Sequence, residues 1–135
     1  MRIMLDTNIL ISALLFPSKQ MEELFRIITT DHKMVLSSYV VDELYDVVKR
    51  KFSNKVIVIE ALLSQMSYEL VYTPKNFKKP LVKIRDNKDY PVIHTAIVEE
   101  VDILLSGDKD FQDLDIGQPR VLTPIEFLKE YSNDF

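Results

Sequence analysis

Short apolar runs alternate with amphipathic segments along this chain, and that alternation constrains its fold more than any other feature. The runs are of the kind that forms strands buried within a sheet, and they cover residues 2–5, 34–36, 70–72, 102–106 and 120–122. Strands alternating with helices indicate an α/β domain. We therefore predict a mostly parallel central sheet of four to five strands, flanked by helices on both faces.

The helix candidates carry apolar residues at helical spacing. They comprise residues 9–15, a segment containing Met21, Leu24, Phe25 and Ile28, a segment containing Val40, Val41, Leu44, Val47 and Val48, a segment starting after Asn54, and residues 91–100. Thr123-Pro124-Ile125-Glu126 is a capping box that opens a final helix. Residues 74–88 are predicted to be a basic connection.

Length and composition indicate one soluble domain spanning residues 1–135, with 47% apolar and 28% charged residues. The chain has no cysteine, which suits a reducing compartment. No run approaches the roughly 20 apolar residues of a membrane helix, and the N-terminal apolar stretch ends at Asp6. We predict a cytoplasmic protein that is not associated with a membrane.

Several kinds of site are excluded by residue counts. The chain has only two glycines, Gly107 and Gly117, too few for a dinucleotide-binding loop and too far apart for a P-loop or a nucleophile elbow. With two histidines and no cysteine, a zinc site is not expected. His94 falls off the apolar stripe of its helix and is predicted to be a surface or boundary residue rather than a catalytic base.

Acidic residues fall where a parallel sheet binds its ligands, at the carboxyl ends of the strands. Asp6 and Asp108 directly follow apolar runs, and Asp89 lies at or near the start of the helix that contains Pro91. On a helical wheel Glu43 borders the apolar stripe of its helix, whereas Asp42 points nearly opposite. The sequence therefore predicts that these four acids meet at one edge: Asp6, Glu43, Asp89 and Asp108.

Any one of these acids could be an ordinary turn or helix-capping residue. Together they would repel one another by roughly 4 kcal/mol per pair near 4 Å at an effective dielectric of 20. Divalent cations relieve such repulsion, and oxygen ligands without His or Cys favour Mg²⁺ or Mn²⁺. One or two such ions would suit phosphodiester hydrolysis.

The net charge of −4 alone argues against a polyanionic partner, although bound metal ions would neutralise the acids. Basic residues are also concentrated between positions 75 and 88. We predict that this segment contacts substrate phosphates through Lys78, Lys79, Lys83, Arg85 and Lys88, although it could equally be a solvated loop.

Four segments resemble the motifs of PIN-domain nucleases, in particular the VapC-like toxins of prokaryotic toxin–antitoxin pairs. They are residues 4–14, with Asp6-Thr7-Asn8, then 37–44, 85–89 and 101–111, with Ser106-Gly107-Asp108. The motifs follow the family order and span nearly the whole chain. One departure is Tyr90, which stands where related sequences often carry a second acid after the third-motif aspartate; Asp86 is only a weak substitute.

The resemblance implies an endoribonuclease that forms a homodimer and is often inhibited by an antitoxin protein. It implies that Asp6, Glu43, Asp89 and Asp108 are the catalytic, metal-binding acids. Asn8 would orient Asp6, and Asp110 would be a further ligand or a nearby supporting acid.

Two other functions remain open at the sequence level. A receiver-like signalling domain also clusters acids at strand ends, but Thr7-Asn8 stands where its second acid would be expected. A PIN-like module could also bind RNA or protein without cleaving it.

Overall fold

The computed structural model describes residues 1–75, 90–112, 114 and 116–133. Its five strands are β1 (Arg2–Leu5), β2 (Lys33–Ser37), β3 (Glu69–Val71), β4 (Ile103–Leu105) and β5 (Arg120–Leu122). They form one sheet in the order β3-β2-β1-β4-β5, and every neighbouring pair is parallel. The predicted α/β fold with a parallel sheet is confirmed.

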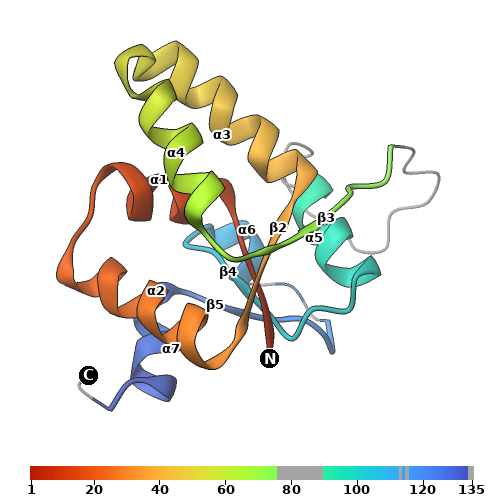
Figure 1. Cartoon of the computed structure of the whole chain (residues 1–135). Helices are drawn as coiled ribbons and strands as arrows, with labels where there is room; N and C mark the ends of the chain where they lie inside the picture. The colour runs from red at the N-terminus through yellow and green to blue at the C-terminus, as the bar shows by residue number, and fades with distance from the viewer. Residues whose placement is uncertain (76–89, 113, 115, 134–135) are drawn as a thin grey trace.

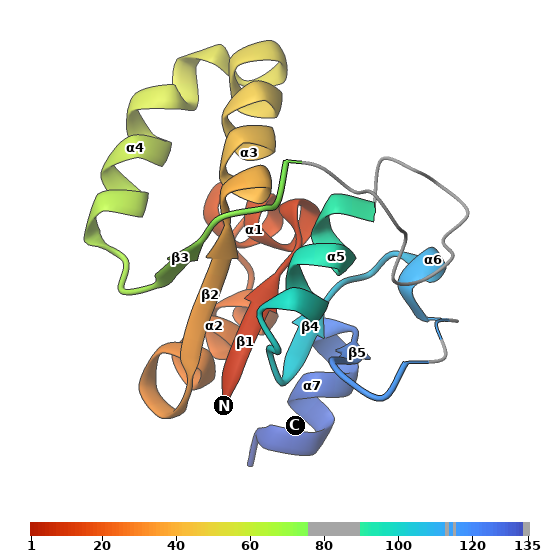
Figure 2. The ribbon, with the colours of Figure 1, turned by 90° about the vertical axis from the view of Figure 1, so that its right-hand side faces the viewer.

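The described helices cover both faces of this sheet. They are α1 (Thr7–Leu15), α2 (Lys19–Asp31), α3 (Ser38–Lys51), the 3₁₀ turn η1 (Ser53–Lys55), α4 (Val56–Gln65), α5 (Tyr90–Val98), α6 (Lys109–Gln112) and α7 (Pro124–Tyr131). In Figure 1 the strands run between α2 and α7 on the left and α5 on the right. Figure 2 shows α3 and α4 rising together as a hairpin above the sheet.

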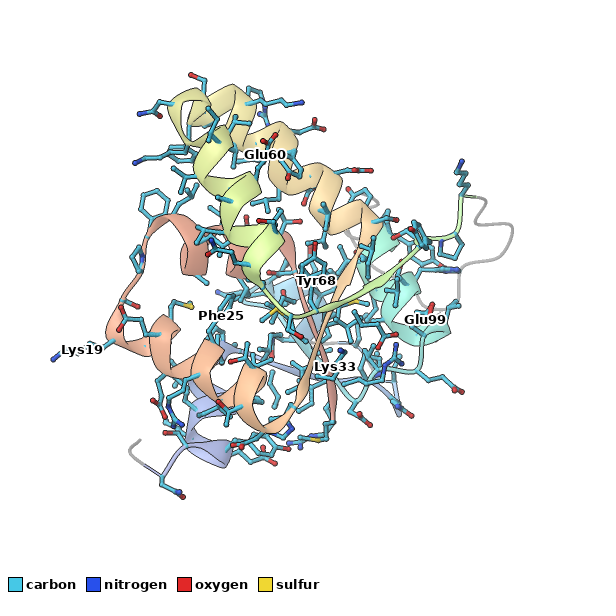
Figure 3. The ribbon with its side chains drawn as sticks, in the orientation of Figure 1. Lys19, Phe25, Lys33, Glu60, Tyr68 and Glu99 are labelled. Carbon is cyan, nitrogen blue, oxygen red and sulfur yellow. The ribbon has the colours of Figure 1, made fainter. Side chains whose placement is uncertain are left out.

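The core lies on either side of the three central strands. Ile3 in β1 is paired with Met34 in β2 and with Ile103 in β4, and none of the three is more than 1% exposed. Side chains from the helices fill the space above and below, and Figure 3 shows the partly buried Phe25 of α2, which packs against this core, while Lys19 projects outward. This packing fixes the strand ends at which the candidate acids stand.

Short polar side chains define where the helices begin. Ser18, Ser37 and Thr123 each accept a hydrogen bond from the backbone amide three residues later. Thr123 and Glu126 form the complete capping box that the sequence predicts. Since β2 ends at Ser37 and α3 begins at Ser38, the Ser37 cap turns the chain directly from the sheet into α3.

Some predicted boundaries are wrong. The helix predicted to reach Glu100 ends at Val98, and Glu100 adopts a left-handed conformation with φ 53°. The strand predicted over 70–72 begins and ends one residue earlier, leaving the Tyr72 side chain 75% exposed. The four-residue helix α6 is not among the predicted helices because it is too short to carry an apolar stripe.

The predicted surface or boundary position of His94 is also wrong. This side chain is buried, and its Nδ1 lies 3.0 Å from the Tyr90 hydroxyl. The helix α5 is enclosed around most of its circumference, since the consecutive residues Val92 to Ala96 are all buried. Residues outside the apolar stripe are therefore covered as well. Burial lowers the pKa of His94 from its ordinary value.

Arg2 lies at the amino-terminal end of β1, on the side of the sheet opposite the candidate site. Its guanidinium donates to both carboxylate oxygens of Glu69, at 3.1 and 2.8 Å, and to the backbone oxygen of Glu99. These bonds join β1 to β3 across the intervening β2 and to the end of α5. Both side chains are partly exposed, so water screens the pair.

We expect Arg2→Gln to lower the free energy of unfolding by about 1 kcal/mol, since it removes a two-point charged hydrogen bond that is only partly screened. Arg120 makes a similar bond to Glu130 in a more exposed setting, so Arg120→Gln serves as the matched control and should change stability less. Urea denaturation of the two variants makes the comparison. Equal losses would show that Arg2 gains nothing from spanning the sheet.

Candidate active site

Asp6 stands where β1 gives way to α1. Its backbone amide continues the pairing with β4 by donating to Leu105 O at 3.1 Å. Its Oδ1 accepts a hydrogen bond of 2.9 Å from the amide of Ile9, so the carboxylate caps α1. The residue is only 6% exposed. The sequence thus places a fixed, nearly buried carboxylate at the carboxyl end of a central strand.

Asp108 follows the neighbouring strand β4. Because Leu5 pairs with Leu105, the chain leaves β1 and β4 side by side at this edge. The fully buried Ser106 accepts a hydrogen bond of 3.0 Å from the Asp108 amide. The Oδ1 of Asp108 in turn accepts a bond of 2.8 Å from the Asp110 amide. These two bonds fix the loop that presents Asp108 beside Asp6.

Glu43 lies on α3, and it reaches the same end of the sheet as Asp6 and Asp108. It is half-buried, whereas Asp42 and Asp46 on the same helix are exposed. Its Oε2 accepts a hydrogen bond of 3.2 Å from the hydroxyl of Tyr39, one turn earlier. The orientation matches the helical-wheel argument, in which Glu43 faces the domain and Asp42 faces away from it.

Asp6, Glu43 and Asp108 line one small cavity of about 30 Å³, which we call the carboxylate hollow; its other lining residues are Thr7, Asn8, Val92 and Phe111. That volume admits about two water-sized spheres. A larger outer hollow of about 400 Å³ adjoins it and shares Asp6, Asn8 and Asp108. The structure thus brings three of the four predicted acids to one opening.

The pKa of Asp6 is raised from its ordinary value of 3.8. Burial is the largest cause, because it disfavours the charged carboxylate, and the charges of Asp108 and Glu43 add to the effect. Hydrogen bonds from Ser106 and Ile9 oppose it without cancelling it. The site is therefore short of positive charge, which a cation would supply.

The residues present fit a hard divalent cation. All three carboxylates are oxygen donors, and the buried Thr7 Oγ1, at the same hollow, has no hydrogen-bond partner among the described residues. No group of three acidic or histidine side chains in the described segments is already close enough to ligate one ion directly. Mg²⁺ commonly keeps several of its waters, so water-bridged binding suits this spacing.

The other predicted site residues have different positions. Asn8 is exposed and lines both hollows. Asp110 lies in the first turn of α6 and lines neither hollow in the part of the chain described here. Outside the described residues lie Asp89 and the predicted substrate-binding residues Lys78, Lys79, Lys83, Arg85 and Lys88.

Three residues that shape the site are not among the site residues predicted from the sequence. Thr7 directly follows Asp6, and Ser106 stands two positions before Asp108. Both are polar residues that are nevertheless buried. Tyr39 holds Glu43 from one turn away, and its position four residues before an acid on the same helix was an available signal.

Comparisons with known proteins identify the family of this chain. The family model for the PIN domain matches residues 2–110, so the chain belongs to the PIN domain family. Among curated proteins, none matches the chain by sequence. Within the described residues, no helix is both long and apolar enough to cross a membrane.

Solved structures that share the fold include the following two. One is VapBC2 from Rickettsia felis, bound to a DNA fragment from its promoter, with 19% identity, a TM-score of 0.71, and coverage of 91% of this chain and 98% of the other. The second is DNA-bound VapBC from Salmonella typhimurium, with 17% identity, a TM-score of 0.69, and coverage of 92% and 98%. The predicted membership of the PIN domain family is confirmed, and these two structures show the same fold.

Proposed function

We propose that this protein is a Mg²⁺- or Mn²⁺-dependent endoribonuclease. The observation that carries the proposal is a nearly buried aspartate, Asp6, that shares one hollow with Glu43 and Asp108 and has its pKa raised by burial and by their charges. Membership of the PIN domain family supports the same function. In this proposal Asp6, Glu43, Asp89 and Asp108 hold one or two ions, and Asp110 is an additional acid nearby.

Bound Mg²⁺ or Mn²⁺ would neutralise the acids, polarise the scissile phosphate and acidify an attacking water. The chain's own contribution is to position the acids. The Ile9 amide holds Asp6 through a hydrogen bond, and the Tyr39 hydroxyl holds Glu43. In this proposal Asn8, which is exposed and lines both hollows, orients Asp6. The outer hollow gives the RNA backbone room to approach.

The test is incubation of the purified protein with single-stranded RNA in the presence of Mg²⁺, Mn²⁺ or a chelator. We expect internal cleavage with either ion and none with the chelator. The alternative, a PIN-like module that only binds RNA or protein, predicts bound but intact RNA under all three conditions. That result, obtained with folded protein, would overturn the proposed activity.

The basic segment is proposed to hold substrate phosphates through Lys78, Lys79, Lys83, Arg85 and Lys88. Reversing Lys78 and Lys79 to glutamate should weaken RNA binding. It should also flatten the salt dependence of binding, because a protein that contacts fewer phosphates releases fewer counterions when it binds. RNA affinity at several salt concentrations measures the effect, with Asp108→Asn added to block cleavage. Unchanged slopes and affinities would direct the search to Lys49, Arg50, Lys51 and Lys55.

We also propose that the chain is the toxin of a toxin–antitoxin pair, working as a homodimer in the cytoplasm. The support is the shared fold with chains of two VapBC structures. A small DNA-binding protein encoded beside this chain would be the antitoxin. When the antitoxin is co-expressed with this chain, the complex purified from the cells should not cleave RNA. Light scattering on the isolated chain tests whether it forms a homodimer.

A further inference from the structure

A third hollow lies beside the catalytic edge, next to the Glu43-bearing face of α3. Its volume is about 310 Å³, at the lower end of the roughly 300–1,000 Å³ typical of small-molecule pockets. Tyr39 and Asp42 line it from α3, Pro74 and Lys75 from the chain after β3, and Pro91 from α5. We call it the lateral hollow.

The wall of the lateral hollow is already tied together. Ser38 Oγ accepts a hydrogen bond of 2.9 Å from the Thr73 amide. The Thr95 hydroxyl donates to the carbonyl of Pro91 at 2.7 Å, and its oxygen lies 3.0 Å from Thr73 Oγ1, from whose hydroxyl it can accept. These bonds join the ends of β3, α3 and α5, so the hollow needs little rearrangement to accept a ligand.

The polar groups left for a ligand stand at the rim. Asp42 and Lys75 are both exposed, and no described residue forms a hydrogen bond or ion pair with either side chain. The two prolines and Tyr39 offer apolar faces. The hollow therefore combines flat apolar surfaces with one acceptor and one cation.

Tyr39 connects this hollow to the proposed active site. Its side chain lines the lateral hollow, and its hydroxyl donates to Glu43, which lines the carboxylate hollow. Tyr39 thus lines one hollow and holds a residue that lines the other. An RNA strand with a phosphate at the carboxylate hollow would bring a neighbouring base to the lateral one.

We propose that the lateral hollow binds a nucleobase adjacent to the scissile phosphate and that Asp42 makes it prefer guanine. This inference rests on the proposed function. Bases unstacked from single-stranded RNA stack on aromatic side chains and are recognised along their Watson–Crick edges. Guanine presents two adjacent donors there, N1–H and N2–H, which match the two oxygens of a carboxylate. Lys75 would contact a flanking phosphate.

The sign of the Asp42 effect separates this proposal from a purely electrostatic one. A carboxylate that makes no contact with a base only repels the phosphates, so removing its charge should strengthen binding of every RNA alike. A carboxylate that accepts from guanine should instead lose affinity for guanine-containing RNA on replacement by asparagine. Asp46, also exposed and one turn further along α3, provides the matched control.

The experiment measures binding of two oligouridines, one with a single guanosine and one with a single adenosine at the same position. All proteins carry Asp108→Asn to block cleavage and are studied with Mg²⁺ present. We expect the guanosine oligonucleotide to bind at least about tenfold more tightly. Asp42→Asn should abolish this preference and Asp46→Asn should keep it. Tyr39→Phe should also keep it, whereas Tyr39→Ala should weaken binding of both oligonucleotides.

Equal affinities for the two oligonucleotides, or no binding of either at low salt, would overturn the proposal. The proposal would also be overturned if Asp42→Asn bound both oligonucleotides more tightly and to the same extent as Asp46→Asn. Cleavage by the wild-type protein is measured in parallel. A guanine preference without cleavage would contradict the proposed nuclease activity and support the base-binding site. Cleavage without the preference would contradict the base-binding site alone.

Discussion

Replacing Asp108 by asparagine should lower the rate of RNA cleavage at least about a hundredfold. The change keeps the size of the side chain and an oxygen that can accept from the Asp110 amide, so the loop after β4 should hold its shape. It removes one of the charges that would bind the cation on which the chemistry depends, and such ions contribute several kcal/mol to the transition state.

The control for this prediction is Asp46→Asn, which makes the same chemical change at an exposed position on α3. Initial cleavage rates at fixed Mn²⁺ give the comparison, with thermal melts to show that both variants are folded. A rate for Asp108→Asn within a few fold of that for Asp46→Asn would remove Asp108 from the site.

Millimolar Mn²⁺ should raise the melting temperature of the wild-type protein. A ligand that binds only the folded state adds about 2.7 kcal/mol at a hundredfold excess over its dissociation constant. Asp6→Asn should lose most of this gain, because it removes the most deeply placed of the three described acids at the carboxylate hollow. Asparagine still caps a helix well, so α1 should keep its start.

Without metal, Asp6→Asn should be more stable than the wild type at pH 7. The folded-state pKa of Asp6 lies above its ordinary value of 3.8, so folding favours the protonated carboxyl. As the pH rises from about 4 through that raised pKa, the wild type loses stability that the variant keeps. Urea denaturation in chelator between pH 4 and pH 7 should therefore show a widening gap, and a constant gap would contradict the burial argument.

The sheet and its acids were predictable because their signals are local. Residues 2–5 form an apolar run that ends in an acid, and this pattern places Asp6 at a strand end without knowledge of any distant residue. Glu43 was predictable from the wheel of one long helix, whose buried stripe is continuous. The capping box at Thr123 likewise lies within four consecutive residues.

Features that depend on distant neighbours were not predictable in the same way. Burial of His94 follows from how completely α5 is enclosed, which its own sequence does not state. The contact between Ser38 and Thr73 joins residues 35 positions apart, so the lateral hollow has no signature in the sequence. The extent of α6 is set by the hydrogen bonds of Asp108 and Ser106 rather than by an apolar stripe.

The most direct test of the central claim is the dependence of the cleavage rate on Mn²⁺ concentration in the wild type and in Glu43→Gln. If acids from three separate elements hold the ion together, the loss of the charge contributed by α3 should shift half-maximal activity to higher Mn²⁺ by about tenfold or more, with Asp46→Asn unchanged. A Glu43→Gln protein that cleaves RNA with the wild-type Mn²⁺ dependence would contradict the account.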